Sequence, residues 1–328
     1  MVDCARMSAR PARVNVLAGP YIERAAQYRK DRDWLTAATN DPRSLFVPVW
    51  RARNLVSRSA SGLDAQLIER QDELFVALEP HLANPTFLGI FRERACFALA
   101  LDDAEAPPAL GGAEFQDLRP VIGALDRDEA GVLAYARALI TWRYRHRYCG
   151  QCGSPTELTS AGHSVTCTNA ECGNEQFPRI DPAIIVLVTD GERVLFGRQA
   201  AWQPGWYSTI AGFVEAGESL EDAVAREVLE ETGIEVSQVD YQSSQPWPFP
   251  QSLMLGFIAQ ARTTAITTKD DELEDARWFS RAEIASGTPL LPPPISISGC
   301  LIEAWCDSGA TKPLREELGA RTWNLRAR

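Results

Sequence analysis

The segment Gly212–Ile234, which reads GFVEAGESLEDAVAREVLEETGI, constrains the fold of this chain more than any other. Ser219 is a suitable helix N-cap and Gly233 a suitable helix stop, so the segment predicts a helix over Ser219–Glu231. The valines of this helix lie on a different face from its cluster of glutamates. The helix can therefore pack on a sheet while the glutamates remain accessible.

Three glutamates fall within an arc of about 100° on one face of this helix: Glu227, Glu230 and Glu231. Carboxylates this close repel one another and weaken an isolated helix. A divalent cation would remove the repulsion, and hard oxygen ligands suit Mg²⁺ or Mn²⁺. Arg226, the one base in the segment, can pair with Glu218 or Glu230 and fix the rotamers of the acidic side chains. The alternative is a solvated acidic face.

The net charge of the chain is concentrated in two places. The 328 residues include 33 lysines and arginines and 44 aspartates and glutamates, a net charge of −11. Residues 212–235 carry a net −7 and residues 269–275 a net −4, so the rest of the chain is neutral. Nucleic-acid binding through charge alone is therefore disfavoured. The apolar runs are shorter than the roughly 20 residues of a membrane span, and no signal peptide is visible. We expect a soluble cytoplasmic protein without membrane contact.

Four of the eight cysteines form two close pairs, Cys149 with Cys152 and Cys167 with Cys172. The spacings C-x2-C and C-x4-C both fall within the range used by tetrahedral structural zinc sites. Disulfides are disfavoured without a secretory signal, and a redox pair would not need two facing pairs. We expect one structural Zn²⁺ bound by four thiolates, with no open position for chemistry.

These features divide the chain into three expected domains: residues 1–148, 149–178 and 179–328. In the first, Ser44–Arg58 and Thr86–Leu101 read as strands and Asp126–His146 as an amphipathic helix. No catalytic constellation is present there, so we expect a mixed α/β domain for dimerisation or substrate closure. The second is the cysteine ribbon. The third alternates strand and helix signals, with a short strand at Tyr207–Ile210, and the fold class is α/β.

Residues 244–252, which read SQPWPFPQS, alternate prolines with Trp247 and Phe249. Proline restricts φ and removes backbone donors, so this segment is expected to be stiff and extended. Its aromatic rings are then available for stacking on a nucleobase or a nicotinamide ring. The alternative is a proline-rich linker or a loop packed on itself.

The segment Gly212–Ile234 matches the pattern G-x5-E-x7-R-E-U-x-E-E-x-G-U, where U is apolar, and so resembles the Nudix box. The resemblance implies a Nudix fold with a mixed sheet between helices. It also implies hydrolysis of a nucleoside diphosphate linked to another moiety, with Mg²⁺ or Mn²⁺ at the pyrophosphate. The implied catalytic residues are Glu227, Glu230, Glu231, Arg226 and Glu218. The implied metal ligands are Glu227, Glu230, Glu231 and the carbonyl of Ala211.

The segment SQPWPFPQS, following a Nudix box, is similar to the NADH pyrophosphatase subfamily. The cysteine ribbon, PVWRARNLV at Pro48–Val56 and LLPPP at Leu290–Pro294 share this similarity, which covers residues 44–306. The resemblance implies a homodimer that cleaves NADH or NAD into nicotinamide mononucleotide and AMP. In some members it implies removal of NAD caps from RNA.

Further site residues follow from the resemblance by motif. Glu272, six residues before Trp278, would be an additional metal ligand. The residues implied to contact the dinucleotide are Phe177, Gln245, Pro246, Trp247, Pro248, Phe249, Pro250, Gln251, Ser252, Ser298 and, from the partner subunit, Arg119. Two departures are the C-x4-C pair, where C-x2-C is commoner, and Gly162, where some relatives have an acidic residue.

Two other functions remain open on the sequence. One is a broader Nudix hydrolase acting on ADP-ribose or similar compounds, against which SQPWPFPQS argues. The other is a catalytically silent zinc-ribbon binding module, which would be expected to have lost at least one of the three clustered glutamates. The sequence does not distinguish NADH, NAD and NAD-capped RNA as substrates, and it does not identify the general base.

Overall fold

The structure is a computed structural model that describes residues 15–60, 62–101, 104–268 and 272–323. Its contacts divide the chain into two compact units. The N-terminal unit comprises Pro20–Ile180 together with Pro246–Ser252. The C-terminal unit comprises Asp181–Gln245 together with the described residues of 15–19 and 253–323. Among the described residues, no helix is long and apolar enough to cross a membrane.

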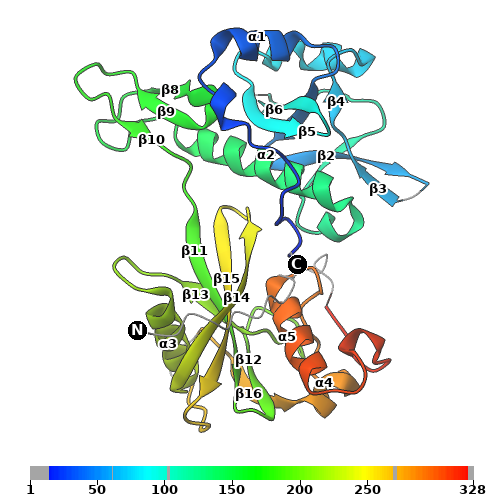
Figure 1. Cartoon of the computed structure of the whole chain (residues 1–328), viewed down its shortest axis with the longest axis vertical. Helices are drawn as coiled ribbons and strands as arrows, with labels where there is room; N and C mark the ends of the chain where they lie inside the picture. Colours follow the sequence, from blue (N-terminus) through cyan, green and yellow to red (C-terminus); the bar gives the residue numbers. More distant parts are fainter. Residues whose placement is uncertain (1–14, 61, 102–103, 269–271, 324–328) are drawn as a thin grey trace, which may run out of the picture. The chain divides into compact units, whose positions relative to one another are not determined.

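The N-terminal unit is built on a seven-stranded mixed sheet (Figure 1). Its strands are β1 (Leu45–Trp50), β2 (Arg53–Ser59), β3 (Gly62–Ala65), β4 (Ile68–Glu69), β5 (Thr86–Phe91), β6 (Arg94–Ala100) and β7 (Glu114–Gln116). The order is β3-β2-β1-β6-β5, with β4 paired to β1 and β7 to β2. Strands β1 and β6 are parallel, whereas β5 and β6 are antiparallel.

The two strand segments expected in this unit are each a hairpin rather than one strand. Ser44–Arg58 turns back at Arg51 and Ala52, and Thr86–Leu101 turns back at Arg92 and Glu93, all four with positive φ. Two consecutive positive-φ residues match the twist of a two-residue hairpin turn. The turn was missed in the sequence because glycine or asparagine normally occupies these positions.

Helices cover both faces of this sheet. They are α1 (Arg32–Asn40), α2 (Arg127–Arg145) and the 3-10 helices η1 (Ala26–Tyr28), η2 (Glu73–His81) and η3 (Ile122–Ala124). Helix α1 and η2 contribute to an aromatic core with Phe46, Phe87 and Phe97. Helix α2 packs against β1, β5 and β6, and it lies across the sheet from α1 (Figure 1). The predicted amphipathic helix is confirmed, with Asp126 as its N-cap.

A small three-stranded sheet follows α2. Its strands are β8 (Thr156–Thr159), β9 (Ser164–Cys167) and β10 (Glu175–Gln176), with β9 in the centre, and the 3-10 helix η4 (Ser160–Gly162) lies between β8 and β9 in the chain. The Cα register pairs Thr156 with Cys167, so the third cysteine stands at the end of a strand pair.

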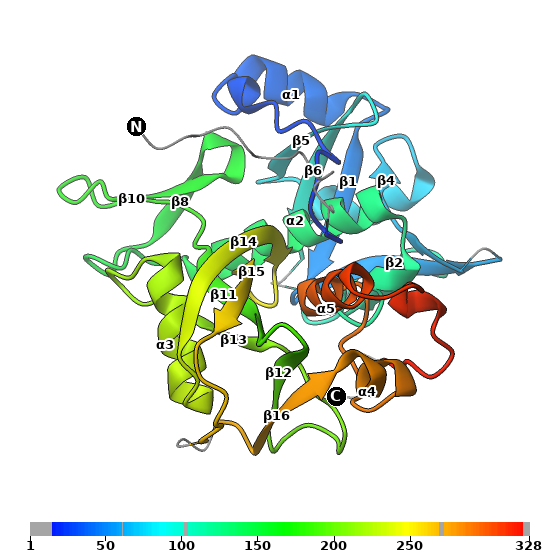
Figure 2. The same cartoon turned by 60° about the horizontal axis from the view of Figure 1, so that its bottom comes forward.

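The C-terminal unit has a six-stranded sheet between helices. Its strands are β11 (Asp181–Thr189), β12 (Arg193–Arg198), β13 (Ile210–Phe213), β14 (Val236–Trp247), β15 (Ser252–Ala261) and β16 (Asp275–Ser280). Its helices are α3 (Leu220–Thr232), α4 (Arg281–Ser286), α5 (Ile297–Ser308) and the 3-10 helix η5 (Leu314–Glu316). The order is β14-β15-β11-β12-β16, with β13 paired to β11, and α3 and α5 flank the sheet (Figure 2).

Strand β11 carries the core of this unit because both of its faces are buried. Ile184 and Val186 pack with α3 in one cluster, whereas Ile185 and Leu187 pack with α5 in another. Alternate residues of a strand point to opposite faces, so a continuous apolar run is what a strand between two helix layers requires. The predicted α/β fold with a sheet between helices is confirmed.

The short strand expected at Tyr207–Ile210 is displaced. The strand begins at Ile210 and ends at Phe213, opposite β11. The Tyr207 amide instead donates a hydrogen bond to the Leu290 carbonyl, and its ring packs in the α5-side core. Gly212 is inside this strand, although glycine weakens a strand interior.

Truncation of Leu301, which is 4% exposed on α5, tests the α5-side core. We expect Leu301→Ala to lower the free energy of unfolding by about 2–5 kcal/mol, because it leaves a cavity against the sheet. Urea unfolding followed by tryptophan fluorescence measures this cost. The matched control is Leu318→Ala, since Leu318 is fully exposed and should cost less than about 0.5 kcal/mol. Equal effects in the two variants would contradict the described packing.

Candidate active site and metal centre

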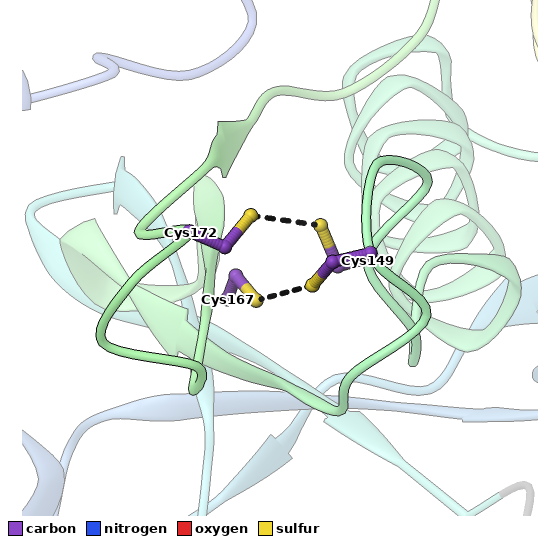
Figure 3. A group of neighbouring side chains, drawn as sticks. Cys149, Cys167 and Cys172 are labelled. Carbon is purple, nitrogen blue, oxygen red and sulfur yellow. Dashed lines mark hydrogen bonds between the residues drawn. The ribbon is translucent and has the colours of Figure 1, made fainter.

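The four grouped cysteines meet in one cluster between the end of α2 and the small sheet (Figure 3). All four Sγ atoms lie within 4.8 Å of one another. The Sγ–Sγ distances are 3.8 Å for Cys149 and Cys172 and 3.4 Å for Cys152 and Cys167. Four thiolates at about 2.3 Å from a tetrahedral Zn²⁺ would be about 3.8 Å apart. The cluster therefore fits zinc in both chemistry and spacing.

Backbone and side-chain donors around the first pair favour thiolates. The Gln151 amide donates to Cys149 Sγ at 3.4 Å. Hydrogen bonds from the Cys152 and Gln151 amides lower the pKa of Cys149, and those from Ser154 lower the pKa of Cys152 to about 6. Thiolates are the form that binds zinc. Burial raises the pKa of Cys167 to about 12, so the ion itself would have to stabilise that ligand as a thiolate.

The longer second pair is accommodated by a turn. The amides of Cys172 and Gly173 both donate to the Asn169 carbonyl, at 3.0 and 2.9 Å, and the Glu171 amide donates to the Asn169 side chain. This turn takes up the two extra residues of C-x4-C, so Cys172 still reaches the cluster. The departure from the commoner spacing changes the turn and leaves the ligand set intact.

Helix α3 presents the clustered glutamates as its caps predict. The Ser219 side chain accepts from the Asp222 amide, and Gly233 ends the helix with φ of 70°. Val224 and Val228 are fully buried against the sheet. The same packing leaves Glu230 exposed, whereas Glu227 is 9% exposed and thus buried.

Gly212 is what allows the Glu227 carboxyl to be buried. Gly212 lies on β13 opposite Ile184, which is on the α3-side face of β11. A Cβ atom at position 212 would overlap the Glu227 carboxyl group. The glycine is therefore needed for close approach of backbone to a side chain. Ala211, whose carbonyl is a predicted ligand, precedes it on the same strand.

Arg226 binds the acidic side chains together. Its guanidinium donates to Glu218 at 2.6 and 2.9 Å, to Glu227 at 2.9 Å and to Glu230 at 3.0 Å. It also donates to the Phe213 carbonyl at 3.0 Å. The predicted pairing is confirmed for both alternatives, Glu218 and Glu230, and it extends to Glu227. Arg226 holds the pKa of Glu218 at about 2.

Glu231 is the residue of this acidic group whose pKa is raised most clearly. Burial, followed by the charges of Glu227, Glu272 and Glu230, raises its pKa to about 8. Burial likewise raises the pKa of Glu227. Among the ion pairs that the described residues form with Glu218, Glu227 and Glu230, Arg226 supplies the positive charge. Hard carboxylate oxygens are what Mg²⁺ or Mn²⁺ binds. The donor set therefore fits such an ion, and Glu272 belongs to the same electrostatic group.

The carboxylates of Glu227, Glu230 and Glu231 do not lie close enough together to form one set of metal ligands. Within the described ranges, the cysteine cluster is the one group of three or more such side chains with ligand atoms within 4.8 Å of each other. Arg226 occupies oxygens of Glu227 and Glu230. Residues 269–271 of the second acidic cluster lie outside the described residues.

The segment SQPWPFPQS is the end of a hairpin and is not extended throughout. Strand β14 continues to Trp247, the chain turns over Pro248–Gln251, and β15 begins at Ser252. The rings of Trp247 and Phe249 meet edge to face with centroids 5.0 Å apart. The guanidinium of Arg119 lies 5.7 Å from the Trp247 ring in the same chain, whereas the resemblance implies a partner-subunit role.

The remaining predicted contact residues have different surroundings. Gln245 is 1% exposed; its amide nitrogen donates to the Val16 and Ile295 carbonyls and its oxygen accepts from the Ile297 amide. Ser298 is buried and shares hydrogen bonds with the Ser208 and Thr209 hydroxyls. Phe177 is 64% exposed. Substrate contact by these residues stays a prediction.

Sequence reasoning missed Arg137, which lies on α2 and contacts the hairpin end. Its Nε donates to the Pro248 carbonyl at 2.9 Å, and its guanidinium lies 4.9 Å from the Phe249 ring. A signal was present: Arg137 stands four residues after Leu133 and three before Ile140, both buried. A charged residue inside an apolar stripe indicates a specific partner.

Comparisons with known proteins agree with this architecture. A NUDIX domain profile matches residues 179–295, an NADH pyrophosphatase-like rudimentary NUDIX domain matches 43–142, and an NADH pyrophosphatase zinc ribbon domain matches 145–177. The solved structure of a Nudix hydrolase from Nitrosomonas europaea aligns with 54% of this chain and with 96% of the residues of that protein, at 17% identity and a TM-score of 0.39. The family assignment therefore rests on the sequence matches.

Relatives along most of the chain complete the assignment. A Macaca fascicularis protein named NAD-capped RNA hydrolase NUDT12 is 33% identical over 337 residues, covering 89% of this chain and 73% of that protein. A Stutzerimonas stutzeri protein named NAD-capped RNA hydrolase NudC is 42% identical over 228 residues, covering 70% of this chain and 79% of that protein. The chain belongs to the Nudix hydrolase family, in the group with an NADH pyrophosphatase zinc ribbon.

Loss of one cysteine tests the zinc centre. We expect the purified protein to contain about one Zn²⁺ per chain and Cys167→Ser to lose most of it, because three thiolates cannot close the tetrahedral site. Metal content by mass spectrometry measures this. Cys300→Ser, outside the cluster, should retain zinc. Full zinc content in Cys167→Ser would contradict the assignment.

Enlarging Gly212 tests its contact with Glu227. We expect Gly212→Ala to weaken Mn²⁺ binding by about tenfold or more, because the added methyl group displaces a predicted ligand. Calorimetric titration measures the affinity. Gly112→Ala is the control, since a Cβ there meets no atom within 4 Å. Unchanged Mn²⁺ affinity in Gly212→Ala would show that Glu227 does not depend on this glycine.

Proposed function

We propose that this protein hydrolyses the pyrophosphate bond of NADH or NAD, giving nicotinamide mononucleotide and AMP. The observation that carries the proposal is the acidic face of α3, where Glu227 is buried against Gly212 and Arg226 binds three glutamates. The relatives named NAD-capped RNA hydrolases support the same bond as the target. Mg²⁺ or Mn²⁺ is the proposed cofactor.

The residues around α3 have distinct proposed roles. Glu227, Glu230, Glu231 and the Ala211 carbonyl hold the metal, with Glu272 as an additional ligand. When bound, the metal polarises the pyrophosphate and lowers the pKa of the attacking water. Arg226 is a positioning residue, since its five donors are directed at Glu218, Glu227, Glu230 and the Phe213 carbonyl rather than at substrate.

The hairpin end supplies the proposed preference for a dinucleotide. Trp247 and Phe249 present two rings whose planes are inclined by 72°, and Pro246, Pro248 and Pro250 limit the backbone freedom around them. Together with Gln251, Ser252, Phe177 and Arg119 they would contact the nicotinamide or adenine ring. Gln245 and Ser298 are more deeply buried, so we propose that they act by holding the segments that do so.

NAD-capped RNA is a second candidate substrate. The observation in its favour is that two of the relatives that align along most of the chain are named for this activity. The reacting bond is the same as in free NAD, so the residues proposed on α3 would serve both. Competition between NAD-capped RNA and free NADH in one assay distinguishes which has the larger kcat/KM. A homodimer and a cytoplasmic location stay predictions.

A substrate panel with Glu231→Gln tests the proposal. NADH, NAD and ADP-ribose are incubated with the protein and Mg²⁺ or Mn²⁺, and the products are separated by chromatography. We expect AMP and reduced nicotinamide mononucleotide from NADH. Glu231→Gln should lower kcat by about a hundredfold or more, because it removes a charge that holds the metal. Addition of EDTA should abolish turnover.

The control variant is Glu235→Gln, which changes an exposed glutamate beyond the end of α3 and should leave turnover within about twofold. Hydrolysis of ADP-ribose alone would favour the broader Nudix hydrolase. No turnover of any substrate, with zinc present, would favour the non-catalytic binding module.

A further inference from the structure

The end of the β14–β15 hairpin cannot hold its own conformation through a normal hydrogen-bond ladder. Pro246, Pro248 and Pro250 have no backbone donor. The Phe249 amide donates to the Trp247 carbonyl at 2.7 Å within the turn. The Pro248 carbonyl needs a donor from outside the hairpin, because a buried carbonyl without a partner is costly.

Arg137 of α2 is that donor. Its Nε donates to the Pro248 carbonyl at 2.9 Å, and its guanidinium lies 4.9 Å from the centre of the Phe249 ring. The same side chain therefore contacts the backbone and the aromatic ring of two consecutive residues. Lysine could not reproduce this, because only the planar guanidinium can donate in its plane and stack on a ring.

The surroundings of Arg137 combine this contact with an ion pair to Asp117. Its side chain is 12% exposed, and its nearest carboxylate, Asp117, is 3.7 Å away and 57% exposed. Burial lowers the pKa of Arg137, but no ordinary pH removes its proton. An ion pair with a well-solvated carboxylate contributes little, so the polar and aromatic groups that Arg137 touches also stabilise its buried guanidinium.

We propose that Arg137 is a positioning residue for dinucleotide recognition: it fixes the Phe249 ring and, through the edge-to-face contact, Trp247. Helix α2 of the N-terminal unit thereby sets the preference for a nicotinamide dinucleotide over a diphosphate that lacks the second ring. This proposal rests on the proposed function. It assigns a substrate-specificity role to a helix without catalytic groups of its own.

Kinetics of three variants test the proposal. Arg137→Met removes the donor and the charge at similar length, Arg137→Lys keeps the charge, and Arg145→Met is the matched control because Arg145 is an exposed arginine on the same helix. We expect Arg137→Met to raise KM for NADH by about tenfold with kcat within about twofold. Its kcat/KM for ADP-ribose should change less, and Arg137→Lys should recover only part of the loss.

A second measurement does not depend on activity. In protein labelled with 5-fluorotryptophan, the ¹⁹F resonance of Trp247 is assigned from its disappearance in Trp247→Phe. We expect Arg137→Met to shift or broaden this resonance, whereas Arg145→Met should leave it unchanged.

The outcomes separate the two proposals. Wild-type protein that fails to hydrolyse NADH would overturn the proposed function, and the role of Arg137 in dinucleotide recognition with it. The ¹⁹F resonance would still show whether Arg137 fixes the hairpin end. Normal NADH turnover with unchanged KM in Arg137→Met would overturn the positioning role alone. Equal losses for NADH and ADP-ribose would also overturn it, because they would indicate a general structural defect.

Discussion

Repulsion among carboxylates on one helix face is the constraint around which the C-terminal unit is organised. Helix α3 holds Glu227, Glu230 and Glu231 together, and Arg226 offsets only part of their charge. Such a helix is not stable by itself, so its position depends on the valines buried against the sheet. The sheet in turn needs α5 on its other face. Together α3, the sheet and α5 hold an electrostatically unfavourable group of carboxylates in place. Such an arrangement is typical of functional sites, here of a predicted cation site.

The parts of the fold that could be predicted are those determined locally. Helix α3 was predictable because Ser219 and Gly233 mark its ends and its apolar residues follow helical spacing. The cysteine cluster was predictable because zinc ligation restricts sequence spacing, and the Asn169 turn shows why one pair can be longer. The hairpins of the N-terminal unit were not, since Arg51 and Ala52 adopt a conformation that their side chains do not favour. In these hairpins, the pairing of the strands determines the backbone conformation of the turn residues and overrides their local preference.

The site residues follow a similar division. Motif spacing identified the acidic group, but it could not show that Gly212 lies directly against Glu227, because that contact joins a strand to a helix. It also could not show that Arg137 and the proline-rich hairpin end form one packing unit, since 111 residues separate Arg137 from Pro248. Prolines are visible in a sequence, whereas the donor that compensates for them is determined by tertiary structure.

Strand β11 has one more consequence. Sliding its neighbour β13 by one residue would turn Ile210, which is 2% exposed in the α3-side core, to the opposite face, so the hydrophobic effect resists the error. Gly212 adds a second, steric reason. In either slipped alignment, the side chain of Ala211 or Phe213 would stand opposite Ile184, where the Glu227 carboxyl needs room. Gly212 thus favours both the correct alignment of the two strands and the burial of Glu227 in the acidic site. A chain misaligned at this position would therefore also have a lower affinity for the predicted metal.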